Sequence, residues 1–363
     1  MLKMLNSFGI ILRKMTNNLK NIRELTFEEI EEFFLTQNRP KFRANQVYKW
    51  LWSNFVYDFN QMTNLSLGDR NLLISNFVIK SISKYEFTES KDGTTKFLFK
   101  IDNAKVVEGV LIPQKDRYTV CISSQAGCSL ACKFCATGKL KLLRNLAAWE
   151  IFDQVYLINK FSLEKYKSKI TNIVYMGMGE PLLNISNVLK SISLINYSHG
   201  LNISQKRITV STAGITKIIK KIADLKPKFN LAISLHSANN KKRSELMEIN
   251  ETNNLSKLLA SVSYFYNITK IKPTYEYVLL SGINDTQDDA EELIKFCKKS
   301  PAKVNLIEYN HVKDISFKKS SKESTQKFID ILEKNKILVK LRRSRGEDIG
   351  AACGQLATQN KKW

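Results

Sequence analysis

The sequence predicts an α/β fold: a partial barrel of six strand–helix units, preceded by a helical accessory domain and a small β meander. After Pro113, short β-rich runs alternate with helical stretches, and nearly continuous apolar runs are typical of parallel strands covered by helices. The polar and glycine-rich words "SSQAGC", "GMGEP", "STAG" and "SLHS" fall at the carboxyl ends of these runs. An open doubly wound sheet also fits the first observation. The second favours a barrel, because the carboxyl end of a βα barrel carries its active site.

Residues 1–22 are predicted to be a basic N-terminal extension without stable structure. The stretch before Glu24 has five basic residues and no acid, which loosely resembles an organellar presequence, although internal methionines are alternative starts. From 23 to 80 apolar positions recur at helical spacing, and "TFEEIEEFFL" opens with a threonine and acids suited to a helix start. Trp50 and Trp52 could stack on nucleic-acid bases, but their spacing is more typical of core residues.

Residues 81–113 predict a three-stranded meander that leads into the barrel. The runs "SKYEFTES", "TTKFLFKI" and "KVVEGVLIP" alternate apolar and polar residues around the turn-like breaks "KDG" and "DNA". The barrel is predicted over 114–345, and residues 346–363 form a C-terminal tail. Its predicted strands are 118–124, 172–177, 207–212, 230–237, 274–280 and 303–309, with a seventh strand at 337–343.

The chain is strongly basic. Its 57 Lys and Arg residues against 34 Asp and Glu residues give a net charge of +23, which is common among proteins that bind nucleic acid. Lys, Asn and Ile are abundant throughout, so part of this charge can also reflect a bias of composition. No apolar run approaches the roughly 18 residues of a membrane helix. Six cysteines in 363 residues are too few for a disulfide scaffold, and we expect a cytoplasmic protein.

Three of the six cysteines, Cys128, Cys132 and Cys135, form a C-x3-C-x2-C loop directly after the first barrel strand. Thiolates at this spacing converge when the backbone turns tightly, as metal ligands do. A structural zinc site needs four ligands, and Cys121 could be the fourth. A [4Fe-4S] cluster held by three thiolates instead leaves one iron open. The spacing favours iron–sulfur over zinc and over inert thiols, and the adjacent aromatic Phe134 strengthens that preference.

The pattern C-x3-C-x-aromatic-C after the first strand of a βα barrel resembles the signature of radical S-adenosylmethionine (SAM) enzymes. In that superfamily SAM chelates the open iron, and an electron from the reduced cluster releases a 5′-deoxyadenosyl radical. The word "MGMGEPL" resembles the superfamily motif in which Gly179 and Glu180 contact the SAM amino group. Glycine admits close backbone approach, and a carboxylate suits an ammonium group. The resemblance implies further SAM contacts at Ser211, Ser234, Leu235, His236 and Asn310.

A longer series of words resembles the bacterial dual-specificity RNA adenine-C2 methyltransferases. It includes "VEGVLIP", "CISSQAGCSLACKFCATG", "EYVLLSGIND" and "DIGAACGQL", and runs from about Thr26 to Leu356. The resemblance implies methylation at C2 of one adenosine in 23S rRNA and of an anticodon-loop adenosine in tRNA. It further implies one [4Fe-4S] cluster, two SAM per turnover, an electron donor such as flavodoxin or ferredoxin, and a monomer. Two departures touch none of this chemistry: "RNLAAWEI" has alanine where a helix-capping threonine is usual, and Glu308 stands where proline is common.

The resemblance also assigns the cysteines outside the cluster. Because C2 of adenine is electron-poor, ordinary SN2 attack on SAM is unavailable. Cys353 is implied to take a methyl group from one SAM, which a second SAM converts to a carbon radical that adds to C2. Cys121 is implied to attack the Cys353 sulfur, giving a transient disulfide as the methylated base leaves. Glu108 matches the family's proton acceptor, with Cys121 thiolate as its competitor. Cys297 has no match and is predicted to be a core residue.

Two alternatives stay open. An antibiotic-resistance relative methylates C8 of the same ribosomal adenosine with the same cysteines, although the meander here resembles the C2 group more. A zinc-stabilised RNA-binding protein without catalytic activity is the alternative from a different class.

Overall fold

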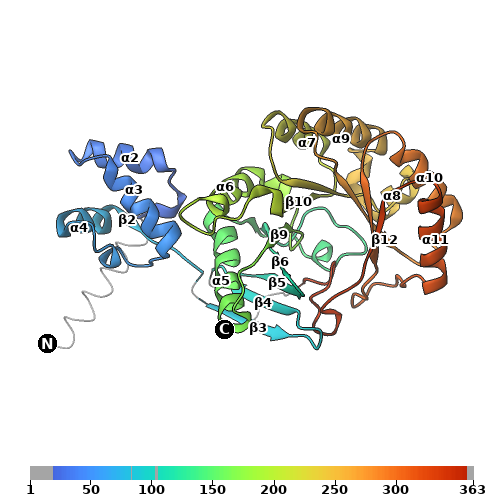
Figure 1. Cartoon of the computed structure of the whole chain (residues 1–363), viewed down its shortest axis with the longest axis horizontal. Helices are drawn as coiled ribbons and strands as arrows, with labels where there is room; N and C mark the ends of the chain where they lie inside the picture. The colour runs from blue at the N-terminus through green and yellow to red at the C-terminus, as the bar shows by residue number, and fades with distance from the viewer. Residues whose placement is uncertain (1–18, 83, 103–104, 358–363) are drawn as a thin grey trace.

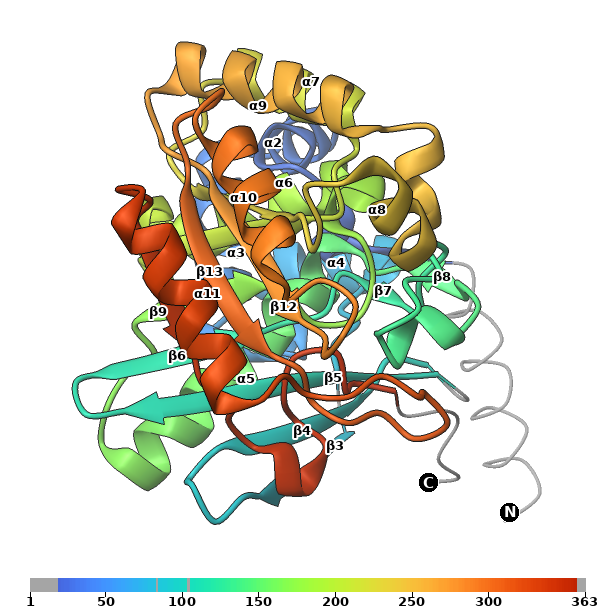
Figure 2. The same cartoon turned by 90° about the vertical axis from the view of Figure 1, so that its right-hand side faces the viewer.

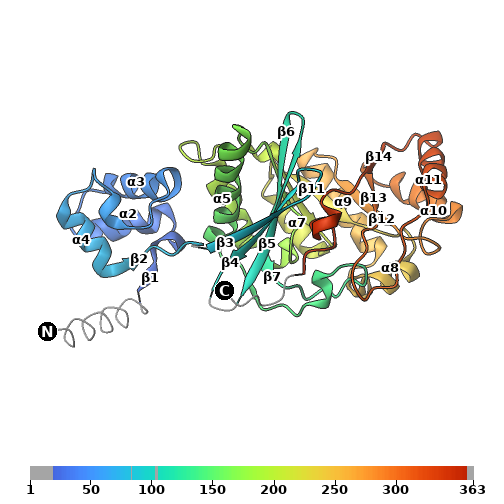
Figure 3. The same cartoon turned by 90° about the horizontal axis from the view of Figure 1, so that it is seen from below.

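The structure, a computed structural model, describes residues 19–82, 84–102 and 105–357. Residues 1–18 of the predicted extension and 358–363 of the predicted tail lie outside this range. The end of the extension was predicted wrongly, because Lys20–Asn21 pair as a strand with Phe77–Val78 and Ile22 is fully buried. A helical N-terminal unit and a larger barrel lie at opposite ends of the long axis (Figures 1 and 3). None of the helices in the described ranges has both the length and the apolar character needed to cross a bilayer.

The N-terminal unit is helical, as predicted, and closes on itself. Helix α2 begins at a capping box, in which Thr26 Oγ1 accepts from the Glu29 N–H at 3.1 Å and the Glu29 carboxylate accepts from the Thr26 N–H at 2.6 Å. Strand β1 (Lys20–Asn21) pairs in parallel with β2 (Phe77–Val78). Trp52 is 1% exposed, which confirms its prediction as a core residue. The helices are α2 (Phe27–Thr36), α3 (Phe42–Lys49), a π-helical turn (Trp50–Asn54) and α4 (Leu67–Asn76).

A buried ion pair attaches the N-terminal unit to the barrel helix α5 (Ala148–Tyr166). Arg23 Nη2 lies 2.6 Å from Asp153 Oδ1, and both side chains are 2% exposed. The Arg23 guanidinium also lies over the Trp52 ring, 4.6 Å from its centroid. Asp153 accepts a further bond from the Ile82 N–H at 2.9 Å. These contacts fasten the start of the chain, the link after α4 and the barrel at one point.

Arg23→Met is therefore expected to lower the free energy of unfolding by about 3–5 kcal/mol, because it leaves the Asp153 carboxylate buried without its cation. Denaturant titration followed by circular dichroism measures the change. The double variant Arg23→Met/Asp153→Leu should recover most of the loss. A single variant as stable as the wild-type protein would contradict the role of this pair.

The larger part of the molecule is built on one ten-stranded sheet. Its strands lie in the order β14-β13-β12-β11-β10-β9-β6-β5-β4-β3. The meander strands are antiparallel: β3 (Lys84–Glu89), β4 (Thr95–Lys100) and β5 (Val106–Gln114). The barrel strands are parallel: β6 (Arg117–Cys121), β9 (Asn172–Tyr175), β10 (Ile208–Thr212), β11 (Asn230–Ser234), β12 (Thr274–Leu279), β13 (Lys303–Glu308) and β14 (Val339–Arg342). The six predicted barrel strands, the seventh strand and the meander are all confirmed. The meander also extends the barrel sheet, because β5 pairs antiparallel with β6.

Helices cover the outer face of the parallel strands (Figures 1 and 2). Among the described residues β14 pairs with β13 alone, so the barrel stays open between β14 and β6 and is partial, as predicted. The helices that cover the outer face are α5, α6 (Ile185–Asn196), α7 (Thr216–Asp224), α8 (Asn240–Leu246), α9 (Leu255–Thr269), α10 (Gln287–Cys297) and α11 (Lys322–Lys334). Cys297, at the end of α10, is 8% exposed and belongs to the core, which confirms its prediction.

Side chains alternate along the parallel strands between an apolar outer face and a polar inner face. In β10, Ile208 and Val210 are fully buried in the core, whereas Thr209 and Ser211 line cavities inside the barrel. This alternation corrects the expectation of nearly continuous apolar strands. Closed βα barrels fill their interior with branched apolar residues. Here many of the inner positions are polar, and the interior is left hollow.

Candidate active site

The three clustered cysteines lie on a loop that a short two-stranded ribbon closes. Strand β7 (Gln125–Ala126) pairs antiparallel with β8 (Arg144–Asn145), so residues 127–143 form one loop beyond the carboxyl end of β6. Gly127 opens this loop with φ of 77°, and a Cβ at that position would lie 2.1 Å from the Lys141 carbonyl oxygen. Only glycine fits there, because both the conformation and the close approach exclude a side chain.

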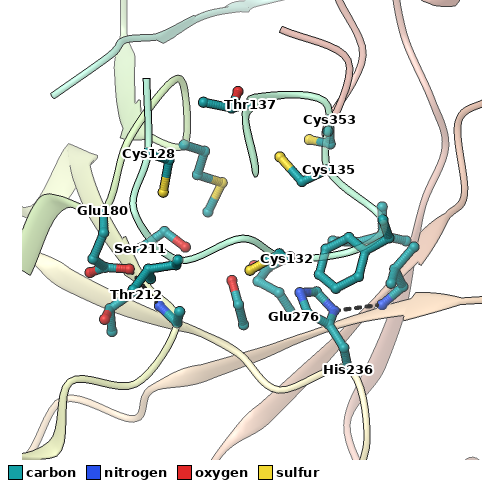
Figure 4. Close-up of a pocket in the computed structure, with 18 of the residues that line it drawn as sticks. Cys128, Cys132, Cys135, Thr137, Glu180, Ser211, Thr212, His236, Glu276 and Cys353 are labelled. Carbon is teal, nitrogen blue, oxygen red and sulfur yellow. Dashed lines mark hydrogen bonds between the residues drawn. The ribbon is translucent and has the colours of Figure 1, made fainter. Parts of the chain in front are cut away.

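The loop and the carboxyl ends of the strands enclose a cavity of about 180 Å³. Figure 4 shows the three cluster cysteines around it, with Glu180 and Ser211 on one side and His236 on another. The structure thus brings together residues that are distant in the sequence. Ten of the predicted site residues line this first cavity: Cys128, Cys132, Cys135, Gly179, Glu180, Ser211, Ser234, His236, Asn310 and Cys353.

The three thiols fit an iron–sulfur cluster better than a single zinc ion. Across the described ranges, no three His, Cys, Asp or Glu side chains stand close enough to hold one metal ion. Cys121, the fourth ligand of the zinc alternative, does not line the first cavity. A structural zinc ion takes four ligands, each at about 2.0–2.3 Å. Three thiols spread around a cavity suit a larger cluster, with one iron left for another ligand.

Burial makes the cluster thiols poor acids. It raises the pKa of Cys128 to about 11 and also raises the pKa of Cys132 and of Cys135. Negative charge on one of these thiols further raises the pKa of its neighbours. A cationic centre reverses this balance, because a coordinating thiol loses its proton outright. The three cysteines therefore suit a metal centre and not free thiolates.

The "GMGE" word forms a tight turn that buries a carboxylate. Gly179 has φ of 96°, and Glu180 is 4% exposed. One Glu180 carboxylate oxygen accepts from the Leu182 N–H at 3.0 Å, and the other accepts from the Ala213 N–H at 2.8 Å. Burial raises the pKa of Glu180, and these two bonds lower it. A carboxylate held in this way presents negative charge to the cavity and is suited to bind an ammonium group.

His236 is buried and neutral. Its backbone is left-handed, with φ of 56°, and Nδ1 accepts from the Val278 N–H at 3.0 Å (Figure 4). Burial and the nearby Arg243 cation lower the pKa of His236 to about 3. Because Nδ1 accepts a bond, the proton of the neutral ring is on Nε2. The Phe134 ring packs edge-on against the imidazole, with centroids 4.6 Å apart, and so joins the cysteine loop to the end of β11.

A second cavity, of about 650 Å³, extends through the barrel from the amino-terminal ends of the strands to Cys121 and Arg342 at the carboxyl ends of β6 and β14. Cys121, at the end of β6, lines this cavity and not the first. Cys353 lines both, as do Arg342, Glu276 and Met176. The pKa of Cys121 is raised to about 12, chiefly by burial and also by nearby Cys353, while Arg342 acts to lower it. Cys121 and Cys353 therefore lie near each other at the junction of the two cavities.

The C-terminal tail is packed on the cysteine loop. The Ala136 N–H donates to the Gly354 carbonyl oxygen at 2.7 Å, and Thr137 Oγ1 donates to the Leu356 carbonyl oxygen at 2.5 Å. Asn310 Nδ2 donates to the Cys353 carbonyl oxygen at 3.2 Å. Asn310 Oδ1 is buried, and within the described part of the chain it has no partner. These bonds hold Cys353 at the cavity junction and leave one amide oxygen for a ligand.

Two predicted residues line neither cavity. Leu235 is fully buried, and its N–H donates to the Glu276 carbonyl oxygen at 2.9 Å. Glu108, on β5, is 1% exposed and lies 3.5 Å from Lys96 Nζ. Its Oε2 accepts from the Ala357 N–H at 3.0 Å. The structure therefore brings Glu108 against the tail.

Arg342 and Glu276 line both cavities and were not predicted from the sequence. Glu276 is 4% exposed, Oε1 accepts from Asn305 Nδ2 at 2.9 Å, and Oε2 has no partner among the described residues. Arg342 Nη1 donates to Met176 Sδ at 3.4 Å. The available signal was the period of two along the last strand, which turns Lys340 and Arg342 to the same inner face.

Gly179→Ala is expected to destabilise the protein by about 3 kcal/mol, from backbone strain and overpacking together. The new Cβ would lie 2.4 Å from Gln125 Cβ, and Gln125 Oε1 accepts the Glu180 N–H at 2.8 Å. Thermal unfolding measures the loss. The control is Gly68→Ala in α4, where the nearest atom would be 3.6 Å away and which should be neutral or slightly stabilising. Equal effects of the two substitutions would contradict the steric argument.

Known proteins match this chain along most of its length. Residues 20–79 match the ribosomal RNA large subunit methyltransferase N-terminal domain, and residues 122–297 match the radical SAM superfamily. The probable dual-specificity RNA methyltransferase RlmN of Cytophaga hutchinsonii is 51% identical over 343 residues, which are 94% of each chain. The dual-specificity RNA methyltransferase RlmN of Campylobacter hominis is 40% identical, over 95% of this chain and 98% of that relative.

A solved structure agrees with these matches. The crystal structure of a radical SAM methyltransferase from Sphaerobacter thermophilus superposes with a TM-score of 0.86 at 36% identity, and covers 93% of this chain and 99% of that one. The fold and the cysteine loop therefore define a radical SAM enzyme, a class whose cofactors are a [4Fe-4S] cluster and SAM. The chain belongs to the RlmN family of dual-specificity RNA methyltransferases.

Proposed function

We propose that this chain methylates C2 of a specific adenosine in 23S rRNA and of an anticodon-loop adenosine in tRNA, and consumes two SAM per turnover. The observation that carries the proposal is the position of Cys353, which lines both the cavity of the cluster cysteines and the larger cavity beyond it. A side chain at that junction can take a methyl group from one cavity and pass it to a base in the other. The names of the relatives, which specify RNA and dual specificity, support the substrate class.

The first cavity is proposed to hold both cofactors. Cys128, Cys132 and Cys135 would bind the cluster, and Gly179 and Glu180 would bind the amino group of SAM. Further SAM contacts are proposed for the polar residues at the other strand ends, namely Ser211, Ser234, His236 and Asn310. When bound, the cluster supplies the electron that cleaves SAM to a radical. An external electron donor such as flavodoxin or ferredoxin is proposed to restore that electron.

Cys353 is proposed to be the methyl carrier and Cys121 the resolving thiol. Attack by the Cys121 thiolate on the Cys353 sulfur forms a disulfide and breaks the bond between that sulfur and the methylene carbon. The electron pair of this bond leaves with the methylene carbon, which takes up a proton and becomes the methyl group of the released base. Their shared cavity, and the influence of Cys353 on the pKa of Cys121, support this pairing. Burial raises the pKa of Cys121, and Arg342 opposes that effect and so favours the thiolate that either role requires.

Removal of the C2 proton is proposed to fall to Cys121 or to Glu108. Cys121 lines the cavity that would take the base, whereas the Glu108 carboxylate is engaged by Lys96 and by the Ala357 N–H. These contacts would have to change before Glu108 reached the base. We therefore favour Cys121 as the proton acceptor.

Mass spectrometry of rRNA and tRNA from a deletion strain, with and without this gene, tests the function. We expect 2-methyladenosine in both RNA classes only when the gene is present. Methylation at C8 of the ribosomal adenosine would instead identify the antibiotic-resistance activity. Colourless protein that contains zinc and no iron would support the RNA-binding alternative without catalytic activity.

A further inference from the structure

The second cavity has a polar wall where a closed barrel would be packed. Its inward side chains come in neighbouring pairs, such as Thr119 beside Asn172 and Thr209 beside Asn230. Branched apolar residues fill these layers in closed barrels. Hydroxyl and amide groups can instead donate and accept hydrogen bonds, as the edges of a nucleobase require. At about 650 Å³, the cavity falls within the range of small-ligand sites.

The mouth of this cavity is cationic. Seven of the lining residues are Lys or Arg, and one is an acid, the buried Glu276. Lys272, Lys303 and Lys340 are exposed: Lys272 precedes β12, Lys303 begins β13, and Lys340 is the second residue of β14. Among the described residues, none of these three lysines forms an ion pair with an acid. Unpaired cations around one opening are the electrostatic footprint of a polyanion.

The other side of the junction is unsuited to the RNA. The first cavity, of about 180 Å³, is covered by the cysteine loop, on which the tail is packed. A base that reaches Cys353 must therefore come through the second cavity, which Cys121 also lines and which opens at the amino-terminal ends of the strands. Enzymes that modify a base take it out of the helical stack, and RNA offers unstacked bases in single-stranded loops.

We infer that RNA enters through the amino-terminal mouth of the barrel, where Lys272, Lys303 and Lys340 bind the phosphates that flank the inserted adenosine. This inference rests on the proposed function and assigns the binding site of its substrate. The rim lysines contact the backbone and carry no sequence information, whereas the Asn and Thr layer meets the base. Affinity at this site should therefore depend strongly on salt, because each phosphate contact releases counterions.

The test compares two triple variants with the same change of charge. Lys272→Gln/Lys303→Gln/Lys340→Gln removes the rim cations, and Lys217→Gln/Lys220→Gln/Lys221→Gln removes three exposed lysines from α7 on the outer face. Binding of an anticodon stem-loop RNA is titrated between 50 and 200 mM salt by fluorescence anisotropy, on holoenzyme of matched iron content. The rim variant should lose about 2–3 from the slope of log affinity against log salt, and roughly tenfold or more in affinity. The outer variant should keep the wild-type slope.

Two outcomes would overturn the inference: an unchanged slope in the rim variant, or an equal loss of slope in the outer variant. The proposed function can fail independently of this inference. Wild-type enzyme that binds RNA with the expected salt dependence but leaves the adenosine unmethylated would refute only the proposed activity. Circular dichroism of both variants excludes unfolding as the cause of a lost slope.

Discussion

Cys121→Ala is expected to accumulate protein that remains covalently joined to RNA. Once the methylene carbon links the Cys353 sulfur to C2, the base leaves only when another thiol attacks that sulfur. Cys121 lines the same cavity as Cys353 and is the thiol that can do so. Labelled RNA incubated anaerobically with reduced enzyme and SAM should migrate with the protein on a denaturing gel. Nuclease digestion and mass spectrometry would then locate the nucleotide on Cys353.

Cys353→Ala should give neither adduct nor methylated RNA, because it removes the methyl carrier. Cys297→Ala is the matched control, since this buried cysteine on α10 lies outside both cavities and should leave methylation intact. Release of methylated RNA by Cys121→Ala at the wild-type rate would remove Cys121 from the pathway. An adduct formed by Cys353→Ala would remove Cys353.

Replacement of any one cluster cysteine should abolish RNA methylation. Cys132→Ala leaves two thiols in the first cavity, too few to hold a cluster that needs three. After anaerobic reconstitution, iron content should fall from about four per chain to near zero, together with the brown absorbance. RNA methylation, measured by mass spectrometry, should fall to background. Cys297→Ala again serves as the control, and full iron content in Cys132→Ala would show that the loop is not the ligand set.

Local features of the fold could be predicted because neighbouring residues determine them. The helix start at Thr26 was predicted from its threonine and the acids that follow, and the structure shows it as a capping box with Glu29, three residues later. The barrel strands were predicted within a few residues, because the change from apolar runs to polar, glycine-rich words marks where each strand ends. The main error was the inner face of the strands, where polar residues such as Asn172 and Thr209 replace a packed interior. A short stretch of sequence shows that a strand is mostly apolar. It does not show which face of the strand lines a cavity.

The sequence by itself determined the class of chemistry, since Cys128, Cys132 and Cys135 lie within eight residues of one loop and need no distant partner to be recognised. Only the tertiary structure decided how the remaining thiols are used. Cys121 and Cys353 lie near each other because β6 and the tail pack at the junction of two cavities. Glu108 lies against the tail because its carboxylate accepts a hydrogen bond from the Ala357 N–H. Contacts of this kind depend on the register of the sheet and on how the chain packs residues that are hundreds of positions apart. Spacing along the chain carries no information about either.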